Sequence, residues 1–278
     1  MVTLAELHVY PVKSCRGLAP GAARVTAAGL EHDREWMIVT PDGRFVTQRE
    51  EPRLALVEVG LADGVLELAA AGAGAVRVPL ATGASGEESS GTPVEVTVWR
   101  DRCRALDQGE AAAAWLGDLL GRPLRLVRFD PAHRRPSDLA WTGGREALNR
   151  FSDGFAMLAI SRASLADLNG RLAQPLPMDR FRPNLVLDGL PPYGEDALHD
   201  LVAGAVRLRR VKPCTRCSIT TTDQATGTVE GEEPLRTLRT YRWDAALRGV
   251  TFGQNLIVVG GAGERLRTGM ELQAESGV

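Results

Sequence analysis

Cysteine is scarce in this chain of 278 residues, which contains only Cys15, Cys103, Cys214 and Cys217. A small fold stabilised by disulfides needs a far denser set of cysteines, so that class of protein is excluded and free thiols are expected. The first residues, MVTLAELHVYPVKSC, place Glu6 and His8 where a signal peptide needs an unbroken apolar core. No apolar run approaches the roughly 20 residues that a membrane span needs. We therefore expect a cytoplasmic protein without a membrane partner.

A strong charge of either sign is also absent. The chain has 33 basic and 35 acidic residues and a net charge of −2 at pH 7, so we expect no nucleic-acid partner. Hydrophobic residues make up 44% of the chain, as in ordinary globular proteins, and the length suffices for one large domain or two modest ones. Lysine occurs only as Lys13 and Lys212, each close to a cysteine. At both positions the compact ammonium group of a lysine therefore stands near a thiol in the sequence.

Alternating apolar residues predict strands along most of the chain. The segments EWMIVTPDGRFVTQRE and LALVEVGLADGVLELAA have the pattern of hairpins, and a third hairpin is predicted in GQNLIVVGGAGERLRTGMELQA. A polar stretch at 82–93 is predicted to be an exposed loop. Helices are predicted at 109–121, 161–172 and 232–242, with Ser161 or Ser164 as the cap of the second. Strands in runs, without regular alternation with helices, predict a mainly β, barrel-like fold with attached helices (α+β).

The segment VKPCTRCSITTTD at 211–223 contains a CxxC pair that has four interpretations. A dithiol oxidoreductase needs this pair at the start of a helix, whereas SITTT favours a strand. Structural zinc needs four ligands, and no other cysteine or histidine stands at ligand spacing. Two idle, buried thiols are the third interpretation. The fourth is a single thiolate that binds a metal or acts as a nucleophile, favoured by the cations Lys212 and Arg216.

Several motifs in this chain resemble one known family. PCTRCSITTTDQATG, followed by EPLRTLRTYR and FGQNL, resembles the C-terminal signature of MOSC-domain proteins, and MDRFRPNLVLDG at 178–189 matches the same family. YPVKSCRG, AGLEHDREWMIV and TQREEPRLALV resemble the β-barrel domain that precedes it. The resemblance runs from about Tyr10 to Leu272 and is closest to the mitochondrial amidoxime-reducing components and bacterial reductases of N-hydroxylated bases. It implies an N-terminal MOSC-associated β-domain over residues 1–105 and a MOSC domain over residues 106–278.

The resemblance also implies a cofactor site. In that family the second cysteine of the pair ligates molybdenum, so Cys217 is the implied metal ligand and catalytic residue, and Cys214 is its neighbour. A soft thiolate suits this metal. The molybdenum cofactor (Mo-molybdopterin) is implied to bind through Lys13, Ser14, Arg34, Arg182, Asn184, Thr215 and Arg216. Further candidates are Gly154, Phe155, Asn255 and, beside the site, Asp196 in GEDALHD, where Leu198 stands in place of a tryptophan of relatives.

The function that the resemblance implies is the reduction of a small N-hydroxylated compound, independent of pyridoxal phosphate. No cysteine follows Cys217, so a [2Fe–2S] module, which needs four cysteines, is not expected in this chain. Electrons are expected from a separate protein, such as a reductase, a ferredoxin-like protein or a flavoprotein. The alternative is a non-catalytic carrier of the cofactor or of sulfur. The five tryptophans are expected to be packing residues rather than to stack on a ligand.

Overall fold

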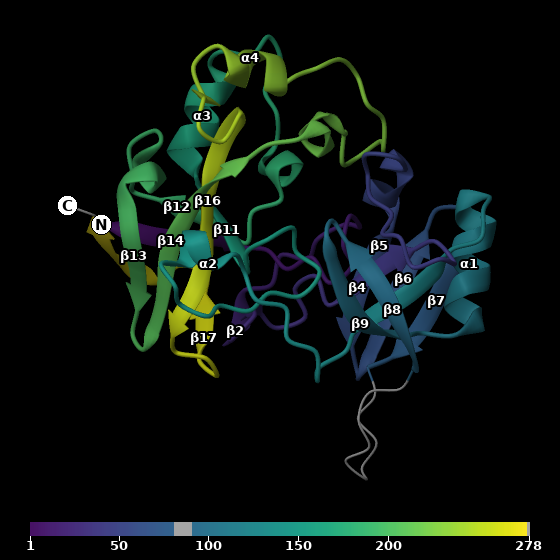
Figure 1. The fold of residues 1–278 in the computed structure, drawn as a ribbon. Helices are drawn as coiled ribbons and strands as arrows, with labels where there is room; N and C mark the ends of the chain where they lie inside the picture. Colours follow the sequence, from purple (N-terminus) through teal and green to yellow (C-terminus); the bar gives the residue numbers. More distant parts are fainter. Residues whose placement is uncertain (81–90, 277–278) are drawn as a thin grey trace.

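A closed β-barrel forms one side of the molecule, on the left in Figure 1. The computed structural model describes residues 1–80 and 91–276. The seven barrel strands follow the order β11-β12-β1-β18-β13-β14-β16, and β16 pairs back with β11. They are β1 (Val2–Leu7), β11 (Met157–Ser161), β12 (Leu185–Asp188), β13 (Leu198–Ala203), β14 (Val206–Thr215), β16 (Gly249–Gly260) and β18 (Glu271–Ser276). The short β15 (Trp243–Asp244) extends the sheet beside β16.

A second group of strands forms the other side, blue in Figure 1. One sheet has the order β4-β10-β9-β8, made of β4 (Trp36–Val39), β8 (Thr92–Val98), β9 (Asp101–Asp107) and β10 (Arg125–Phe129). A meander contains β5 (Glu58–Ala62), β6 (Val65–Ala70) and β7 (Gly74–Pro79). Helix α1 (Glu110–Leu120) buries Trp115 and Leu116 against this side. A small sheet of β17 (Arg265–Arg267), β2 (Ala22–Thr26) and β3 (Gly29–Leu30) completes the strands.

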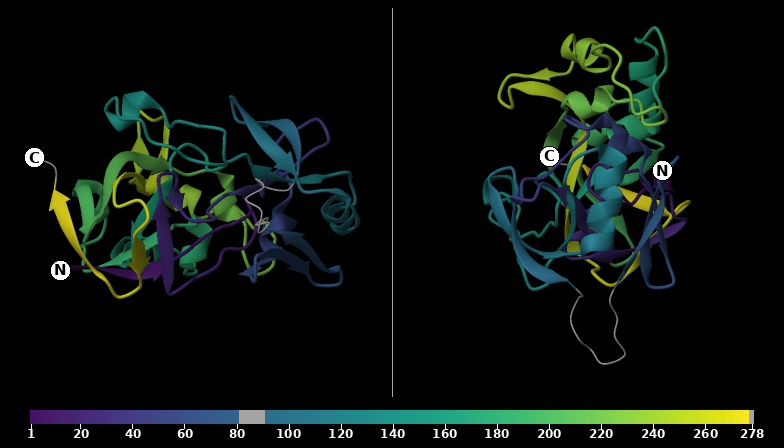
Figure 2. Two further views of the ribbon diagram at one scale, coloured as in Figure 1. Left: turned by 90° about the horizontal axis from the view of Figure 1, so that it is seen from below. Right: turned by 90° about the vertical axis from the view of Figure 1, so that its right-hand side faces the viewer.

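Each side has its own hydrophobic core. The barrel core contains Leu4, Leu187 and Leu256, whereas the other side buries Trp36 and Leu66 in a separate cluster. Figure 2 shows the two sides next to each other and the N-terminus on the barrel side, where β1 pairs with β18. The mainly β architecture with attached helices is therefore confirmed. The hydrophobic clusters of the barrel and of the other side are packed separately, which leaves room for a site between the two sides, a common position for ligand sites.

The three predicted helices are confirmed in position, although all are shorter than predicted, the first by only one residue at each end. They are α1, α3 (Arg162–Asn169) and α4 (Leu235–Arg239). The Ser161 hydroxyl accepts a hydrogen bond from the Ser164 amide at 3.0 Å, so the predicted cap is present. The sequence patterns missed α2 (Leu139–Thr142) and the 3₁₀ turns η1 (Pro52–Leu56), η2 (Met178–Phe181), η3 (Gly194–Ala197) and η4 (Ser218–Thr221).

One of the three predicted hairpins, at the end of the chain, is wrong because its strands pair with distant partners, and the first is present only as a short antiparallel ladder. β4 pairs with β10, and it also meets the segment after its own turn. There Val39 bridges to Phe45, and the amides of Thr40 and Val46 donate to the carbonyls of Arg44 and Ile38, both at 2.9 Å. At the end of the chain, β16 pairs with β14, β17 with β2, and β18 with β1 and β13. The hairpin of β5 and β6 is confirmed. Most of the predicted loop at 82–93 lies outside the described residues.

The division of the chain between residues 105 and 106 stays a prediction. β9 crosses that point, and β10 belongs to the same sheet as β8 and β9. At the other end, β1 contributes to the barrel. No helix in the described ranges is long and apolar enough to cross a membrane.

Asp200 on β13 generates a stability prediction. Its buried carboxylate accepts hydrogen bonds from Arg209 and Arg207 of β14, both at 2.8 Å, and these bonds lower the pKa of Asp200 to about 2. Its pKa in the unfolded chain is near 3.8, so the stabilisation is present above pH 3.8 and is lost as the pH falls towards 2. Asp200→Asn is expected to remove about 2 kcal/mol at neutral pH. Urea unfolding of both proteins should show this difference shrinking in acid, and a difference independent of pH would contradict the assignment.

Candidate functional site

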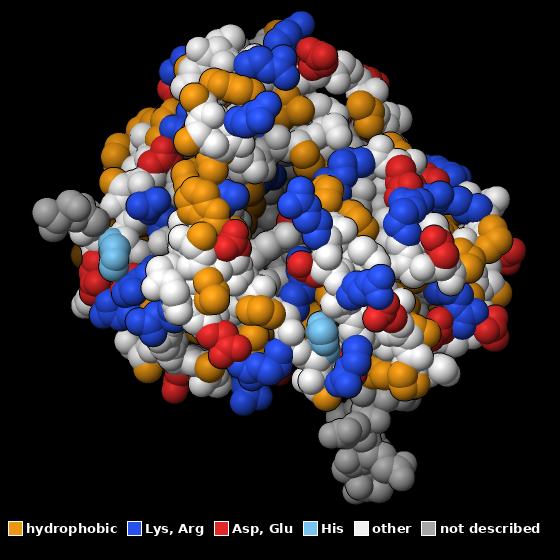
Figure 3. Space-filling view, viewed as in Figure 1, with side chains coloured by type: hydrophobic (Ala, Val, Ile, Leu, Met, Phe, Trp, Pro, Cys, Tyr) orange, Lys and Arg blue, Asp and Glu red, His pale blue; other side chains and the backbone are white. Residues whose placement is uncertain are grey.

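A cavity lies between the barrel and the other side of the molecule. Figure 3 shows the hollow in this face, with Lys and Arg side chains around it. The structure brings all eight predicted site residues to its lining: Lys13, Ser14, Arg34, Arg182, Asn184, Thr215, Arg216 and Cys217. The further candidates Gly154, Phe155 and Asn255 also line it. Segments far apart in the sequence therefore meet at one place, while the binding role of each residue stays a prediction.

The two cysteines of the CxxC pair differ in their surroundings. Both thiols are free; Cys217 is exposed, whereas Cys214 is half-buried and packs against an apolar cluster. The Arg216 guanidinium donates a hydrogen bond to the Cys214 sulfur at 3.0 Å. Among the described residues, the one close group of three potential metal ligands is His199, Asp200 and Glu275, which contains neither cysteine. The surroundings therefore favour the interpretation of one accessible thiol with a neighbour.

The strand predicted after Cys217 is wrong. Residues Ser218–Thr221 form the 3₁₀ turn η4, which begins directly after Cys217. The Thr220 hydroxyl donates to the Cys217 carbonyl at 2.9 Å, and the Thr221 hydroxyl donates to the Ser218 carbonyl at 2.7 Å. These local side-chain bonds offset the β preference of threonine and turn the chain away from the barrel edge. The turn leaves the Cys217 thiol exposed at the cavity.

Arg34 and Arg182 stand together over one buried ring. Their guanidinium carbons lie 4.5 and 4.2 Å from the centroid of Tyr10. Arg34 pairs with Asp33 at 2.6 Å, whereas the buried Nη2 of Arg182 has no hydrogen-bond partner among the described residues. Burial lowers the pKa of Arg182 to about 10, and the nearby Arg34 adds to this shift. A second buried donor in the cavity wall, Nε of Arg216, is also unpartnered in the described part of the chain.

Asn184 uses its whole side chain to join segments of the protein. Its Nδ2 donates to the His8 carbonyl at 3.1 Å and to Asp33 at 3.0 Å. Its Oδ1 accepts from Arg34 at 3.0 Å and from the Leu158 amide at 3.1 Å. An amide offers two donors and two acceptor sites, so all four are occupied. Asn184 therefore positions Arg34, and its direct contact with a cofactor stays a prediction.

Lys13 forms an ion pair with Asp153 in the cavity wall. The nearly buried ammonium donates to the Asp153 carboxylate at 2.6 Å and to the Phe151 carbonyl at 2.8 Å. Burial lowers the pKa of Lys13, and Asp153 opposes this shift. Desolvation by itself would raise the pKa of Asp153, but the Lys13 ammonium outweighs it and holds that pKa well below its usual range. The cavity therefore presents an ionised carboxylate next to its cations.

The backbone at the cavity is held in an unusual conformation. Ser14, Arg34 and Arg182 have φ values of 69°, 46° and 53°, in the left-handed region that residues with a side chain seldom adopt. Trp99, which donates from its indole nitrogen to Asp153 at 3.1 Å, has φ of 56°. Each such residue costs about 1 kcal/mol or more, and these conformations cluster at functional sites. The fold positions these side chains against their local preference.

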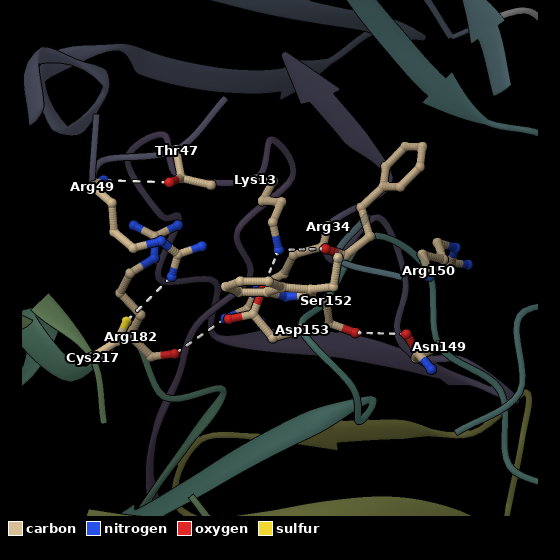
Figure 4. Close-up of polar contacts among 12 residues, drawn as sticks. Lys13, Arg34, Thr47, Arg49, Asn149, Arg150, Ser152, Asp153, Arg182 and Cys217 are labelled. Carbon is tan, nitrogen blue, oxygen red and sulfur yellow. Dashed lines mark hydrogen bonds and ion pairs between the residues drawn. The ribbon is translucent and has the colours of Figure 1, made fainter. Parts of the chain in front are cut away.

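Sequence reasoning missed Arg49, Trp99 and Asp153. Arg49 donates from Nη1 to the Cys217 sulfur at 3.3 Å, as Figure 4 shows. Arg49 lies in TQREEPRLALV, one of the motifs that carried the resemblance, but nothing in that motif indicated a contact with Cys217. Trp99, Trp141 and Trp243 are exposed, and the expectation that the tryptophans are packing residues rather than ligand-stacking ones stays a prediction.

Two predicted neighbours of the site lie elsewhere. Asp196 pairs with Arg242 at 2.7 Å and accepts from Gln254 at 2.6 Å. Lys212 lies 4.7 Å from the centroid of the exposed Trp141 ring. Neither Asp196 nor Lys212 belongs to the lining of the cavity.

Comparison with known proteins gives matches over most of the chain. The MOSC N-terminal beta barrel domain matches residues 1–123, and the MOSC domain matches residues 147–273. Mitochondrial amidoxime-reducing component 1 of Homo sapiens is 38% identical over 252 residues, which cover 86% of this chain and 72% of that protein. Mitochondrial amidoxime reducing component 2 of Bos taurus is 34% identical over 247 residues, with 86% and 72% covered.

Solved structures match only in part. YiiM from Geobacillus stearothermophilus is 18% identical with a TM-score of 0.32, covering 51% of this chain and 71% of that chain. A protein of Bordetella bronchiseptica with a solution structure is 27% identical with a TM-score of 0.30, covering 38% and 85%. These scores are too low to support an argument about fold or function.

The variant Asn184→Ala tests whether the hydrogen bonds of Asn184 at the cavity stabilise the protein. The change leaves the Leu158 amide and one Arg34 donor without their acceptor, and each buried unsatisfied group costs about 1–3 kcal/mol. We expect the free energy of unfolding to fall by about 3 kcal/mol in urea titrations. Asn169→Ala, which removes two surface bonds to Leu176, is the control and should cost about 1 kcal/mol. Equal losses in the two variants would contradict the role of Asn184.

Proposed function

This chain belongs to the family of MOSC-domain proteins that includes the mitochondrial amidoxime-reducing components, and we propose that it is a molybdenum-cofactor-dependent reductase of N-hydroxylated compounds. The observation that carries the proposal is the exposed Cys217 thiol in a cavity surrounded by lysine and arginine side chains. The names of the relatives state the reduction of amidoximes, which contain an N–O bond.

The donors of the cavity fit a cofactor that has a phosphate and a metal. Arg182 and Arg216 each present a buried N–H that no other described residue accepts, and phosphate oxygens are strong acceptors for guanidinium groups. Arg122 and Arg180 have such donors outside the lining as well, so the inference rests on the two that face the cavity, where a bound anion would accept from them. The Cys217 sulfur supplies the soft ligand that molybdenum, already bound by sulfur, accepts.

We assign each residue a separate task in this proposal. Cys217 would bind the metal, and Lys13, Ser14, Arg34, Arg182, Thr215 and Arg216 would hold the pterin and phosphate. Asn184 would fix Arg34 through its hydrogen bond at 3.0 Å. The bound cofactor would supply the two-electron chemistry that removes oxygen from the N–O bond, while the chain supplies binding, orientation and charge.

We also propose that the electrons come from a separate donor protein in the cytoplasm. Apart from the CxxC pair, the chain has only Cys15 and Cys103, and both are buried. Burial raises the pKa of Cys15 to about 12 and that of Cys103 to about 11, so neither offers an accessible thiolate for a second redox centre. A donor protein of the reductase, ferredoxin-like or flavoprotein class would fill this role.

Cys217→Ala is expected to abolish the reduction of benzamidoxime and to lower the molybdenum content by about 10–100-fold, since a metal ligand is lost. The matched variant Cys214→Ala should lose far less of both, because it removes no metal ligand and only the sulfur that accepts from Arg216 in the cavity wall. Protein from a host that makes the cofactor is assayed for metal, and turnover is driven by reduced methyl viologen. Wild-type turnover in Cys217→Ala would refute the proposal, and bound molybdenum without any turnover in the wild type would favour a carrier.

Arg182→Gln tests the anion-binding part of the site. It removes the buried donor that has no partner in the described chain, so the cofactor should be retained about tenfold less well after gel filtration. Arg16→Gln removes an exposed arginine that pairs with Glu58 outside the cavity and serves as the control. Equal retention of pterin, measured by fluorescence after release, in both variants would argue against a phosphate at Arg182.

A further inference from the structure

Arg49 connects the two sides of the cavity through the sulfur of Cys217. Arg49 lies in the turn after β4, on the side opposite the barrel, and Cys217 follows the barrel strand β14. The Nη1 of Arg49 donates to Sγ of Cys217 at 3.3 Å (Figure 4). Cys217 is the proposed metal ligand, so this arginine touches the one protein atom that would bond the metal.

Two further contacts hold Arg49 in this position, and the ring in one of them is itself anchored. Its guanidinium carbon lies 4.5 Å from the centroid of the Trp99 ring. The Trp99 indole nitrogen donates to Asp153 at 3.1 Å, and Asp153 also accepts from Lys13 at 2.6 Å. The backbone amide of Arg49 donates to the Thr47 hydroxyl at 3.3 Å. A chain of contacts therefore runs from buried Lys13 through Asp153, Trp99 and Arg49 to Cys217.

The simplest alternative is an exposed arginine that touches the thiol by chance. Two observations argue against it. Trp99 lies in the two-residue turn between β8 and β9, which accounts for its φ of 56°, and its indole nitrogen donates to Asp153, so the ring is fixed independently of Arg49. In addition, the guanidinium of Arg49 contacts this ring and the Cys217 sulfur at once, at 4.5 and 3.3 Å, so two separate contacts fix it at the thiol.

We propose that Arg49 is a positioning residue for Cys217, held in place by Trp99; this rests on the proposed function of Cys217 as the metal ligand. A hydrogen bond from Arg49 fixes the direction of the sulfur and withdraws electron density from it. Hydrogen bonds to a ligating sulfur are known to tune the reduction potential of a metal centre. The bond stabilises the more electron-rich state, so its loss makes the reduction potential more negative.

The test compares the loaded wild-type protein with Arg49→Ala, Arg49→Lys, Trp99→Ala and Arg44→Ala. Arg44 is the matched control, because it is an exposed arginine of the same loop that pairs with Glu50 instead. Three properties are measured: molybdenum content, the reduction potential, and the electron paramagnetic resonance signal of the half-reduced metal. Reduction of benzamidoxime with reduced methyl viologen gives kcat and KM.

For Arg49→Ala we expect a molybdenum content within about twofold of the wild type, a more negative potential, an altered resonance signal and about tenfold lower kcat. Arg49→Lys should recover part of the potential, since it restores a cation and a donor. Trp99→Ala should shift the potential in the same direction by a smaller amount. Arg44→Ala should match the wild type, which separates a general loss of charge from the specific contact.

The outcomes separate this inference from the proposed function. Wild-type potential and resonance signal in Arg49→Ala would overturn the role of Arg49 while leaving Cys217 as the ligand. A wild-type protein that binds no molybdenum would overturn the proposed function, and with it the role of Arg49. If Arg49→Ala does not fold, circular dichroism reveals this, and Arg49→Lys together with Trp99→Ala decides the question through the same potential and signal.

Discussion

The candidate site depends on the hydrogen bonds of one buried side chain, that of Asn184. It is fully buried and bonds to His8, Asp33, Arg34 and Leu158, so it ties the segment after β1 to the barrel strands β11 and β12. Each side of the molecule has its own core, and their relative position at the cavity must be fixed by polar contacts of this kind. A buried network with every donor and acceptor satisfied is rigid and specific. The hydrogen bonds of Asn184 therefore hold the segments around the cavity in fixed positions.

Several positively charged side chains lie together at the cavity, although like charges repel one another. Arg34 and Arg182 lie over the same Tyr10 ring, and burial raises the pKa of Tyr10 to about 12, so the phenol stays neutral and does not balance them. Asp33 and Asp153 each pair with one cation, Arg34 and Lys13, which leaves the buried Nη2 of Arg182 unpartnered among the described residues. An anionic ligand would remove this cost, since charge-assisted bonds to phosphate are strong. The electrostatics and the exposed thiol thus support the same kind of ligand.

Local motifs predicted much of the site but not its connections. Cys217, Arg182 and Lys13 stand in short sequence patterns, and the structure brings them to one cavity. The contact of Arg49 with Cys217 joins residues 168 positions apart, and a local sequence pattern does not reveal which distant residues meet in the fold. Likewise, β16 was assigned to a terminal hairpin because a nearby partner was visible in the sequence, whereas barrel closure gave it the distant partners β14 and β11. The turn after Cys217 was missed because threonine hydroxyls bonded to local carbonyls and overrode their strand preference.

We propose that one thiol, Cys217, binds molybdenum in the cavity between the two sides of the molecule. Anomalous X-ray diffraction at the molybdenum absorption edge, from crystals of the loaded protein, tests this directly. We expect a single strong peak within bonding distance of the Cys217 sulfur, with cofactor density reaching Arg182 and Arg216. A peak at Cys214, a peak outside the cavity, or cofactor bound away from Cys217 would contradict it.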